Sequence, residues 1–168
     1  MRTCIFAGTF DPITIGHQSI IKKCLKKYGK VLVVIGSNAQ KNTFFTDAER
    51  TELVKETFKD YSGITVVNYL DLKEEYKDYL LNNGARIYVR GIRNSKDRKF
   101  EKEMRKKNAS LYPFIKTKFI TCPKKYKGVS SSLVREQILK NQDFLTLVPQ
   151  NIQTSIIKLI AKKLKKIN

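Results

Sequence analysis

The stretch GTFDPITIGH, residues 8–17, decides the fold that this sequence predicts. It follows a short apolar run, CIFA (residues 4–7), and precedes apolar residues at helical spacing between Ile20 and Tyr28. This order indicates a strand, a glycine turn and a helix that begins near Gly16. Ligands of open α/β sheets bind beyond the carboxyl ends of the strands, and a helix N-terminus there attracts phosphate. The stretch therefore predicts a phosphate site with His17, the single histidine, in the first helical turn.

Strands and helices alternate along the rest of the chain with short connections. Apolar runs predict strands over 31–35, 64–67, 87–89 and 117–121, and periodicity predicts helices over 46–58, 72–81 and 99–112. Thr46 and Glu49 form a capping box at the start of the first of these helices. Two further helices start at the serines 130–132 and at Pro149. The pattern predicts one domain, 1–168, with a Rossmann-like fold: a doubly wound five-stranded parallel sheet with helices on both faces and a C-terminal helix over about 149–167.

Composition excludes several classes of protein. The 168 residues are 41% hydrophobic, which fits a globular domain, and no run approaches the ~18 apolar residues of a membrane span. Asp11 and Pro12 interrupt the N-terminus before a secretory apolar region forms, so we expect a cytoplasmic protein. The cysteines at 4, 24 and 122 show no metal-ligand spacing and have apolar neighbours. They are predicted to be core residues, and no resident metal site is expected.

The net charge of +19 and the pI of 9.9 raise the hypothesis of nucleic-acid binding. The excess is mostly lysine spread along the chain, as an AT-rich genome would also produce, and the same field would steer a polyanionic small substrate. The C-terminal segment 152–167 has lysines mostly on one side and an apolar face on the other, which would suit an anionic membrane. The apolar face consists of Ile152, Ile156, Leu159, Ile160 and Leu164. We expect that face to pack on the core instead. An RNA- or membrane-surface-binding protein remains the alternative of a different class.

Groups suited to polyphosphate follow several of the predicted strands. Thr9, Phe10 and His17 follow the first, Lys41 follows the second, and the fourth ends in RGIR (90–93). The serines 130–132 follow the fifth, at a helix start. Because the carboxyl ends of parallel strands share one edge of a sheet, we expect these groups to meet there. Asp11 and Pro12 are expected to shape the turn rather than to take part in chemistry.

The chain resembles the phosphopantetheine adenylyltransferases, within the nucleotidyltransferases that carry a T/H-x-G-H motif. The resemblance runs nearly end to end. It rests on GTFDPITIGH (8–17), Lys41, FTDAER (45–50), RGIR (90–93), Phe100 with Glu103, and VSSSLVRE (129–136). Thr14 favours this family, since cytidylyltransferases and nicotinamide-nucleotide adenylyltransferases typically place histidine there.

The resemblance implies an enzyme that transfers AMP from ATP to the 4′-phosphate of phosphopantetheine, giving dephospho-CoA and pyrophosphate by in-line attack without a covalent intermediate. It implies Mg²⁺ brought with ATP, and a homohexamer, with neither nucleic acid nor membrane as a partner. A related transferase that uses another phosphorylated acceptor, such as nicotinamide mononucleotide, is the alternative.

The resemblance also implies roles for particular residues. His17, Lys41 and Arg93 would be catalytic, and the acceptor would contact Thr9, Lys41, Lys73 and Arg90. ATP would be bound by Thr9, Phe10, His17, Gly91, Ile92, Arg93, Glu103, Tyr126, Lys127, Gly128, Val129, Ser130, Ser131 and Ser132. The segment between Arg93 and Phe100 is two residues longer than the family usually has, so Glu101 is an alternative to Glu103.

Overall fold

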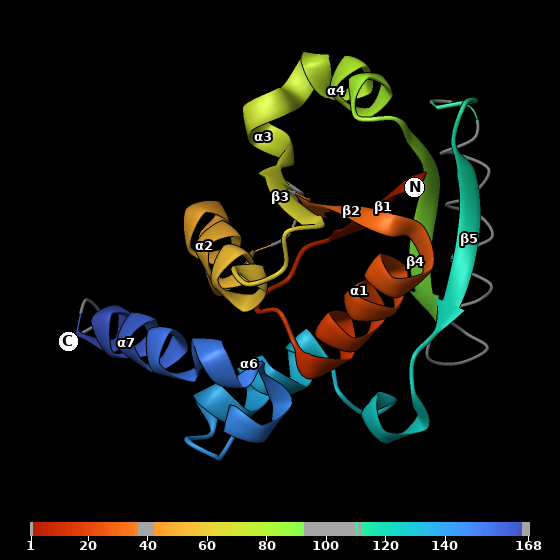
Figure 1. The fold of residues 1–168 in the computed structure, drawn as a ribbon. Helices are drawn as coiled ribbons and strands as arrows, with labels where there is room; N and C mark the ends of the chain where they lie inside the picture. Colours follow the sequence, from red (N-terminus) through yellow and green to blue (C-terminus); the bar gives the residue numbers. More distant parts are fainter. Residues whose placement is uncertain (1, 37–41, 93–109, 111, 166–168) are drawn as a thin grey trace.

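The described part of the chain contains the predicted parallel sheet. The computed structural model describes residues 2–36, 42–92, 110 and 112–165, which are drawn as coloured ribbon in Figure 1. The strands in these ranges are β1 (Arg2–Gly8), β2 (Gly29–Ile35), β3 (Ile64–Asn68), β4 (Ala85–Ile92) and β5 (Lys116–Thr121). They pair in parallel in the order β3-β2-β1-β4-β5. The predicted α/β fold with a five-stranded, Rossmann-like sheet is confirmed.

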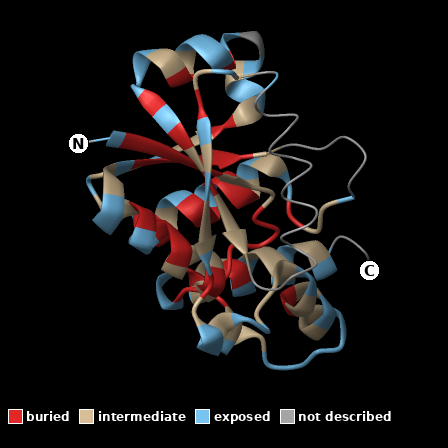
Figure 2. Cartoon of the chain, turned by 90° about the vertical axis from the view of Figure 1, so that its right-hand side faces the viewer, coloured by how far each residue is buried: buried red, intermediate tan, exposed pale blue. Residues whose placement is uncertain are grey.

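Helices cover both faces of this sheet, as expected for a doubly wound fold. One face packs against α1 (Ile15–Tyr28), α2 (Asp47–Phe58), α6 (Ser131–Leu139) and α7 (Gln153–Leu164). The other packs against α3 (Tyr69–Leu72) and α4 (Tyr76–Asn82), which stand at the top of Figure 1. Figure 2 shows buried strands between helices whose outer surfaces are exposed. Because both faces are covered, β2 is a continuous apolar run rather than an alternating one.

The strand order places the site. The chain winds outward from β1 through β2 to β3 on one side and from β4 to β5 on the other. The order reverses between β1 and β4, and the crevice at their carboxyl ends is where such sheets bind ligands. The turn that follows β1 and the end of β4 therefore border the expected site.

The helix predicted over 72–81 is wrong in its boundaries and its continuity. Asn68 accepts a hydrogen bond from the N–H of Leu70 and so caps a helix that begins at Tyr69. At Lys73 the backbone turns to φ +36°, and a 3-10 turn, η1 (Lys73–Glu75), separates α3 from α4. The helix predicted over 99–112 falls almost entirely outside the described residues. The apolar periodicity therefore located helical backbone without showing the break.

The C-terminal helix differs from its prediction at its start and on one face. It begins with a 3-10 turn, η4 (Gln150–Ile152), before α7 starts at Gln153. Ile152 and Ile156 are fully buried in the core, as expected. Leu164, which was expected on the same buried face, is 58% exposed. Within the described ranges, every helix is too short or too polar to cross a lipid bilayer.

The remaining short elements are 3-10 turns, η2 (Lys124–Tyr126) and η3 (Leu145–Leu147). The cysteines at 4, 24 and 122 are buried, which confirms their prediction as core residues.

Candidate active site

His17 is held in place by the N-terminus of the helix that carries it. Thr14 is the N-cap of α1, and its hydroxyl accepts a hydrogen bond from the N–H of His17. In return, the N–H of Thr14 donates to His17 Nδ1 over 3.2 Å. The two residues therefore form a reciprocal capping box, with histidine in the place usually taken by glutamate or glutamine.

The capping box decides which ring nitrogen of His17 can donate. A backbone N–H can only donate, so Nδ1 must accept and cannot carry a proton. The neutral imidazole consequently has its N–H at Nε2. The ring of Phe10 packs edge to face against the imidazole, with centroids 5.2 Å apart, and restricts its rotation. The sequence predicted a neutral donor, and the structure assigns the donor to Nε2.

Phe10 itself belongs to the core. Its side chain is 2% exposed, and its backbone has φ +50°. The Cβ that a side chain would add at Gly8 would lie 3.0 Å from the Phe10 ring. The buried ring of Phe10 therefore supports His17, and the contact of Phe10 with ATP stays a prediction.

Asp11 fastens the β1–α1 turn to two distant segments. Its carboxylate accepts hydrogen bonds from the N–H groups of Phe44 and Phe45, each over 2.8 Å, and it is 4% exposed. Arg135 of α6 donates to the backbone carbonyl of Asp11 over 2.6 Å and lies 3.5 Å from its carboxylate. The expectation that Asp11 shapes the turn is confirmed.

Arg50 was not predicted from the sequence, and it is among the most deeply buried side chains of the described chain. It lies on α2, is 1% exposed, and pairs with Asp47 one turn earlier. Its guanidinium also donates to the backbone carbonyls of Thr9 and Gly36, which follow β1 and β2. Burial lowers the pKa of Arg50, and the Asp11 carboxylate opposes that shift.

The start of α6 lies against the same turn. Ser130 caps the helix by accepting from the N–H of Leu133, and the Ser131 hydroxyl donates to the carbonyl of Pro12 over 2.8 Å. Ser132 accepts from Arg135. The N-termini of α1 and α6 therefore both lie at the β1–α1 turn, and each brings the N–H groups and the positive dipole end of a helix start to it. This arrangement suits a polyphosphate.

At the end of β4, Gly91 is half-buried and faces α1. A Cβ there would lie 2.6 Å from Cδ1 of Ile20, the end of a flexible side chain, so the glycine leaves room for Ile20 between α1 and β4. The close approach of the Gly91 backbone to ATP stays a prediction. Arg90 lies one residue earlier with its guanidinium over the Tyr88 ring, and Ile92 accepts from the N–H of Cys122.

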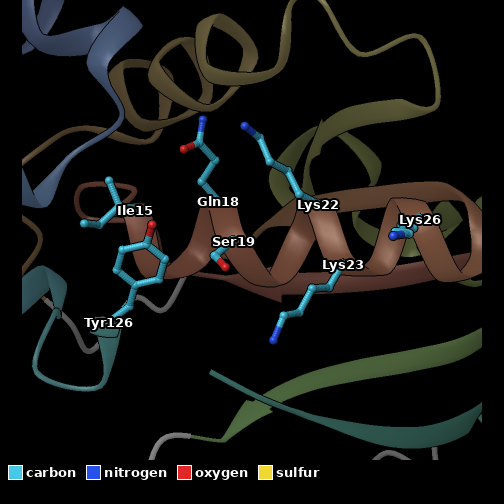
Figure 3. A pocket seen from close by; sticks show the side chains of 7 residues that line it. All are labelled: Ile15, Gln18, Ser19, Lys22, Lys23, Lys26 and Tyr126. Carbon is cyan, nitrogen blue, oxygen red and sulfur yellow. The ribbon is translucent and has the colours of Figure 1, made fainter. Parts of the chain in front are cut away.

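The loop over 124–129, predicted to contact ATP, packs on the first turn of α1. Figure 3 shows Tyr126 beside Ile15, next to a groove of about 330 Å³ that runs along α1. The groove is lined by Ile15, Gln18, Ser19, Lys22, Lys23, Lys26 and Tyr126. Lys23 also donates to the carbonyl of Thr121 at the end of β5. The charged residues that line the groove are all lysines, so the groove along α1 is positively charged. Lys127 is exposed, and nothing lies within 4 Å of a Cβ added at Gly128.

Several predicted site residues lie outside the described residues, and one of the described ones lies away from His17. Lys41, Arg93 and Glu103, with its alternative Glu101, lie outside the described residues. Lys73 is exposed on η1, beyond α3 at the top of Figure 1, whereas α6 stands at the bottom. Among the described side chains, no group of three His, Cys, Asp or Glu residues could hold a metal ion.

Comparison with known proteins places this geometry in a family. The family model described as cytidylyltransferase-like matches residues 5–137, so the chain belongs to that family. A phosphopantetheine adenylyltransferase of Flavobacterium psychrophilum is 37% identical over 153 residues, which cover 91% of this chain and 99% of that protein. Another, of Nitrosospira multiformis, is 33% identical and covers 97% of both chains. Within the cytidylyltransferase-like proteins, the chain is a member of the phosphopantetheine adenylyltransferases.

The fold has solved counterparts of low sequence identity. A bifunctional NMN adenylyltransferase/ADP ribose pyrophosphatase of Francisella tularensis superposes with a TM-score of 0.65 at 16% identity. The match covers 99% of this chain and 54% of that one. At this identity the likeness concerns the fold alone.

Proposed function

We propose that this protein transfers AMP from ATP to the 4′-phosphate of phosphopantetheine, releasing pyrophosphate and forming 3′-dephospho-CoA. The observation that carries the proposal is the His17 ring, whose capping box assigns the donor hydrogen to Nε2. The ring belongs to the first turn of α1, in a chain that is 37% identical to a phosphopantetheine adenylyltransferase.

The reaction needs positioning and charge neutralisation more than proton transfer. A phosphate monoester has a second pKa of about 6, so the acceptor is already mostly dianionic at pH 7. Its oxygen attacks the α-phosphorus of ATP, the bond from that phosphorus to the bridging oxygen of the β-phosphate breaks, and pyrophosphate leaves. The His17 Nε2–H would donate to the α-phosphate oxygens as their charge grows. No covalent intermediate on the protein is required.

Different residues would bind ATP and the acceptor. Ser130, Ser131 and Ser132, with the N–H groups at the start of α6, would face the β- and γ-phosphates. Thr9 and Lys41 would hold the acceptor phosphate, with Arg90 as a further contact. Lysines along the α1 groove would raise the local concentration of both anions. Arg93 and the segment around Glu103 would complete the nucleotide site.

Magnesium would arrive on the phosphates of ATP. The described side chains offer no carboxylate cluster to a resident ion, and the Asp11 carboxylate is occupied by two backbone N–H groups and Arg135. Mg²⁺ commonly keeps several waters and binds through substrate phosphates, where it neutralises charge.

The direct test is incubation of the protein with ATP, Mg²⁺ and phosphopantetheine, with dephospho-CoA detected by mass and pyrophosphate measured in the same sample. Formation of both products in equal amounts is expected. Nicotinamide mononucleotide in place of phosphopantetheine tests the alternative acceptor, which would be the correct one if it alone released pyrophosphate. Steeply salt-dependent RNA binding without any turnover would favour the non-enzyme alternative.

We also infer a cytoplasmic homohexamer, as the family resemblance implies. Light scattering on the eluate of a sizing column, at several protein concentrations, measures the assembly. A mass that stays at one chain of 19.5 kDa would contradict it.

A further inference from the structure

Buried, charged side chains bind the backbone at the end of β2 and just before α2. Arg50 donates to the carbonyl of Gly36, which follows β2, over 3.3 Å. Asp11 accepts from the N–H groups of Phe44 and Phe45, which precede α2. Arg50 is 1% exposed and Asp11 is 4% exposed. Side chains buried to this degree are held by their bonds and cannot swing away without leaving a charge unpaired.

Arg50 also binds the backbone that follows the neighbouring strand, β1. Its guanidinium donates to the carbonyl of Thr9 and pairs with Asp47 in the first turn of α2. One planar fork therefore connects the residues that follow β1, the residues that follow β2 and the start of α2. A lysine carries the same charge but offers a single ammonium on a flexible stem, so it cannot make this set of contacts at once.

We propose that Arg50 and Asp11 are positioning residues that set the separation of the two reactants without touching either. The inference rests on the proposed function, which assigns the acceptor phosphate to Thr9 and Lys41. The carbonyl of Thr9 accepts a hydrogen bond from Arg50. His17 lies at the other end of the turn that contains Asp11. Displacement of a reacting group by ~1 Å can cost about 10²-fold in rate.

The main test is Arg50→Lys in the full chain, with the KM of phosphopantetheine and the KM of ATP measured separately. We expect the acceptor KM to rise by about 10-fold or more and the ATP KM to change by less than about 3-fold. The difference is expected because α6 is tied to the β1–α1 turn through Ser131 and Arg135, which do not contact Arg50. Titration of the variant with phosphopantetheine in the absence of ATP should show the same loss of affinity, as an increase in the Kd of phosphopantetheine.

Asn151→Ala is the matched control. The Asn151 amide donates to the carbonyls of Glu56 and Thr57, at the opposite end of α2 from Arg50. Like Arg50→Lys, the Asn151→Ala substitution therefore removes hydrogen bonds between a side chain and backbone carbonyls, and it does so at the end of α2 that lies away from the carboxyl ends of β1 and β2. We expect a lower Tm with both KM values unchanged. Equal KM shifts in Arg50→Lys and Asn151→Ala would overturn the proposal, because they would follow from loss of stability alone.

Asp11→Asn gives a second measurement if Arg50→Lys does not fold. The amide can accept one of the two backbone N–H groups, but its NH₂ opposes the other and the attraction for Arg135 is lost. Since Asp11 faces α6 as well, we expect both KM values to rise and kcat to fall by about 10-fold or more. Wild-type constants in a folded Asp11→Asn variant would refute the role.

The proposed function and the positioning role fail in different ways. Wild-type protein that releases pyrophosphate with nicotinamide mononucleotide and not with phosphopantetheine would contradict the proposed acceptor. The positioning role would then be measured with that acceptor, because the contacts of Arg50 are with backbone carbonyls and do not depend on what the acceptor carries. Turnover of phosphopantetheine with unchanged constants in Arg50→Lys would contradict the positioning role alone.

Discussion

The starts of α1 and α2 use the same capping device for two different purposes. In α1, Thr14 and His17 exchange side-chain and backbone bonds, and in α2, Thr46 and Glu49 do the same. The third helical residue of α2 is a glutamate whose carboxylate also accepts from Lys163 of α7 over 2.8 Å. In α1 it is a histidine whose second nitrogen carries the donor hydrogen. The comparison teaches that a helix cap becomes a candidate catalytic group when its capping side chain has a second, opposite end that can act on a ligand.

Replacing His17 by glutamate would convert the α1 cap into the α2 type, and it should produce the largest effect. Glutamate can close the same capping box, so the Tm should stay near that of the wild type. The donor at Nε2 is lost and a carboxylate faces the phosphates, so kcat should fall by at least ~10²–10³-fold. Thermal melts and pyrophosphate release measure the two effects. His17→Ala controls for the added charge: it should lose the activity and also the cap, and near-wild-type turnover in it would remove His17 from the mechanism.

Thr14→Ala should have an intermediate effect. The cap hydroxyl is lost, which costs about 1 kcal/mol of unfolding free energy. The N–H of residue 14 can still donate to Nδ1, so the imidazole keeps its tautomer but loses one support. We expect kcat to fall by about 10-fold. Thr14→Ser retains the hydroxyl and should restore both quantities. Failure of serine to restore kcat would show that the methyl group, not the cap, matters.

Glu49→Ala should affect stability alone. It removes the α2 capping box and the pair with Lys163, at a cost of about 1 kcal/mol by urea denaturation. Turnover per folded molecule should stay within about 2-fold, because the bonds of Glu49 are with Thr46 and Lys163 and the contacts of Arg50 with Thr9 and Gly36 remain. A loss of kcat comparable with that of His17→Ala would end the distinction between the two caps.

The smallest expected effect is the pH dependence that Glu49 gives to the free energy of unfolding. Burial alone would raise its pKa, but bonds from Lys163 and from Thr46 outweigh burial and lower it below the ordinary 4.5. A lowered folded-state pKa stabilises the protein above about 4.5, and that contribution disappears as the pH falls through the folded value.

Glu49→Gln isolates the stability that comes from ionisation of Glu49, because glutamine keeps the capping box and cannot ionise. We expect the wild type to be more stable than the variant by about 0.2–1 kcal/mol at pH 7, with the difference vanishing in acid. A difference that grows as the pH is lowered would contradict the sign.

The comparison also marks how far the site was predictable. The Thr46–Glu49 box was predicted, because serine or threonine followed three residues later by glutamate is a known sequence pattern. The Thr14–His17 box follows the same spacing, yet histidine is not a residue that the pattern expects, so the sequence predicts His17 as a donor to phosphate and not as a capping residue. The pattern T-x-x-H at a predicted helix start would have revealed it.

Arg50 and Arg135 could not be assigned from the sequence. Each stands in a motif used to infer the family, but their partners lie 41 and 124 residues away, at Thr9 and Asp11. Nothing local distinguishes a buried arginine that binds backbone carbonyls from one that faces solvent. The prediction that Leu164 is buried was wrong for the same reason. Helical periodicity places Leu164 on the same face as Ile156, but periodicity does not show where along the helix the contact with the core ends, and Leu164 is exposed.

The sequence by itself determined the alternation of strands and helices, the strand, turn and helix start at 8–17 and the family, because apolar periodicity, turn glycines and helix caps are properties of neighbouring residues. The tertiary structure alone decided that Asp11, Arg50 and Arg135 fasten the turn, that Gly91 makes room for Ile20, and that Nε2 carries the donor hydrogen. These features depend on contacts between segments far apart in the chain, or on a single hydrogen-bond direction, and neither is written in local spacing.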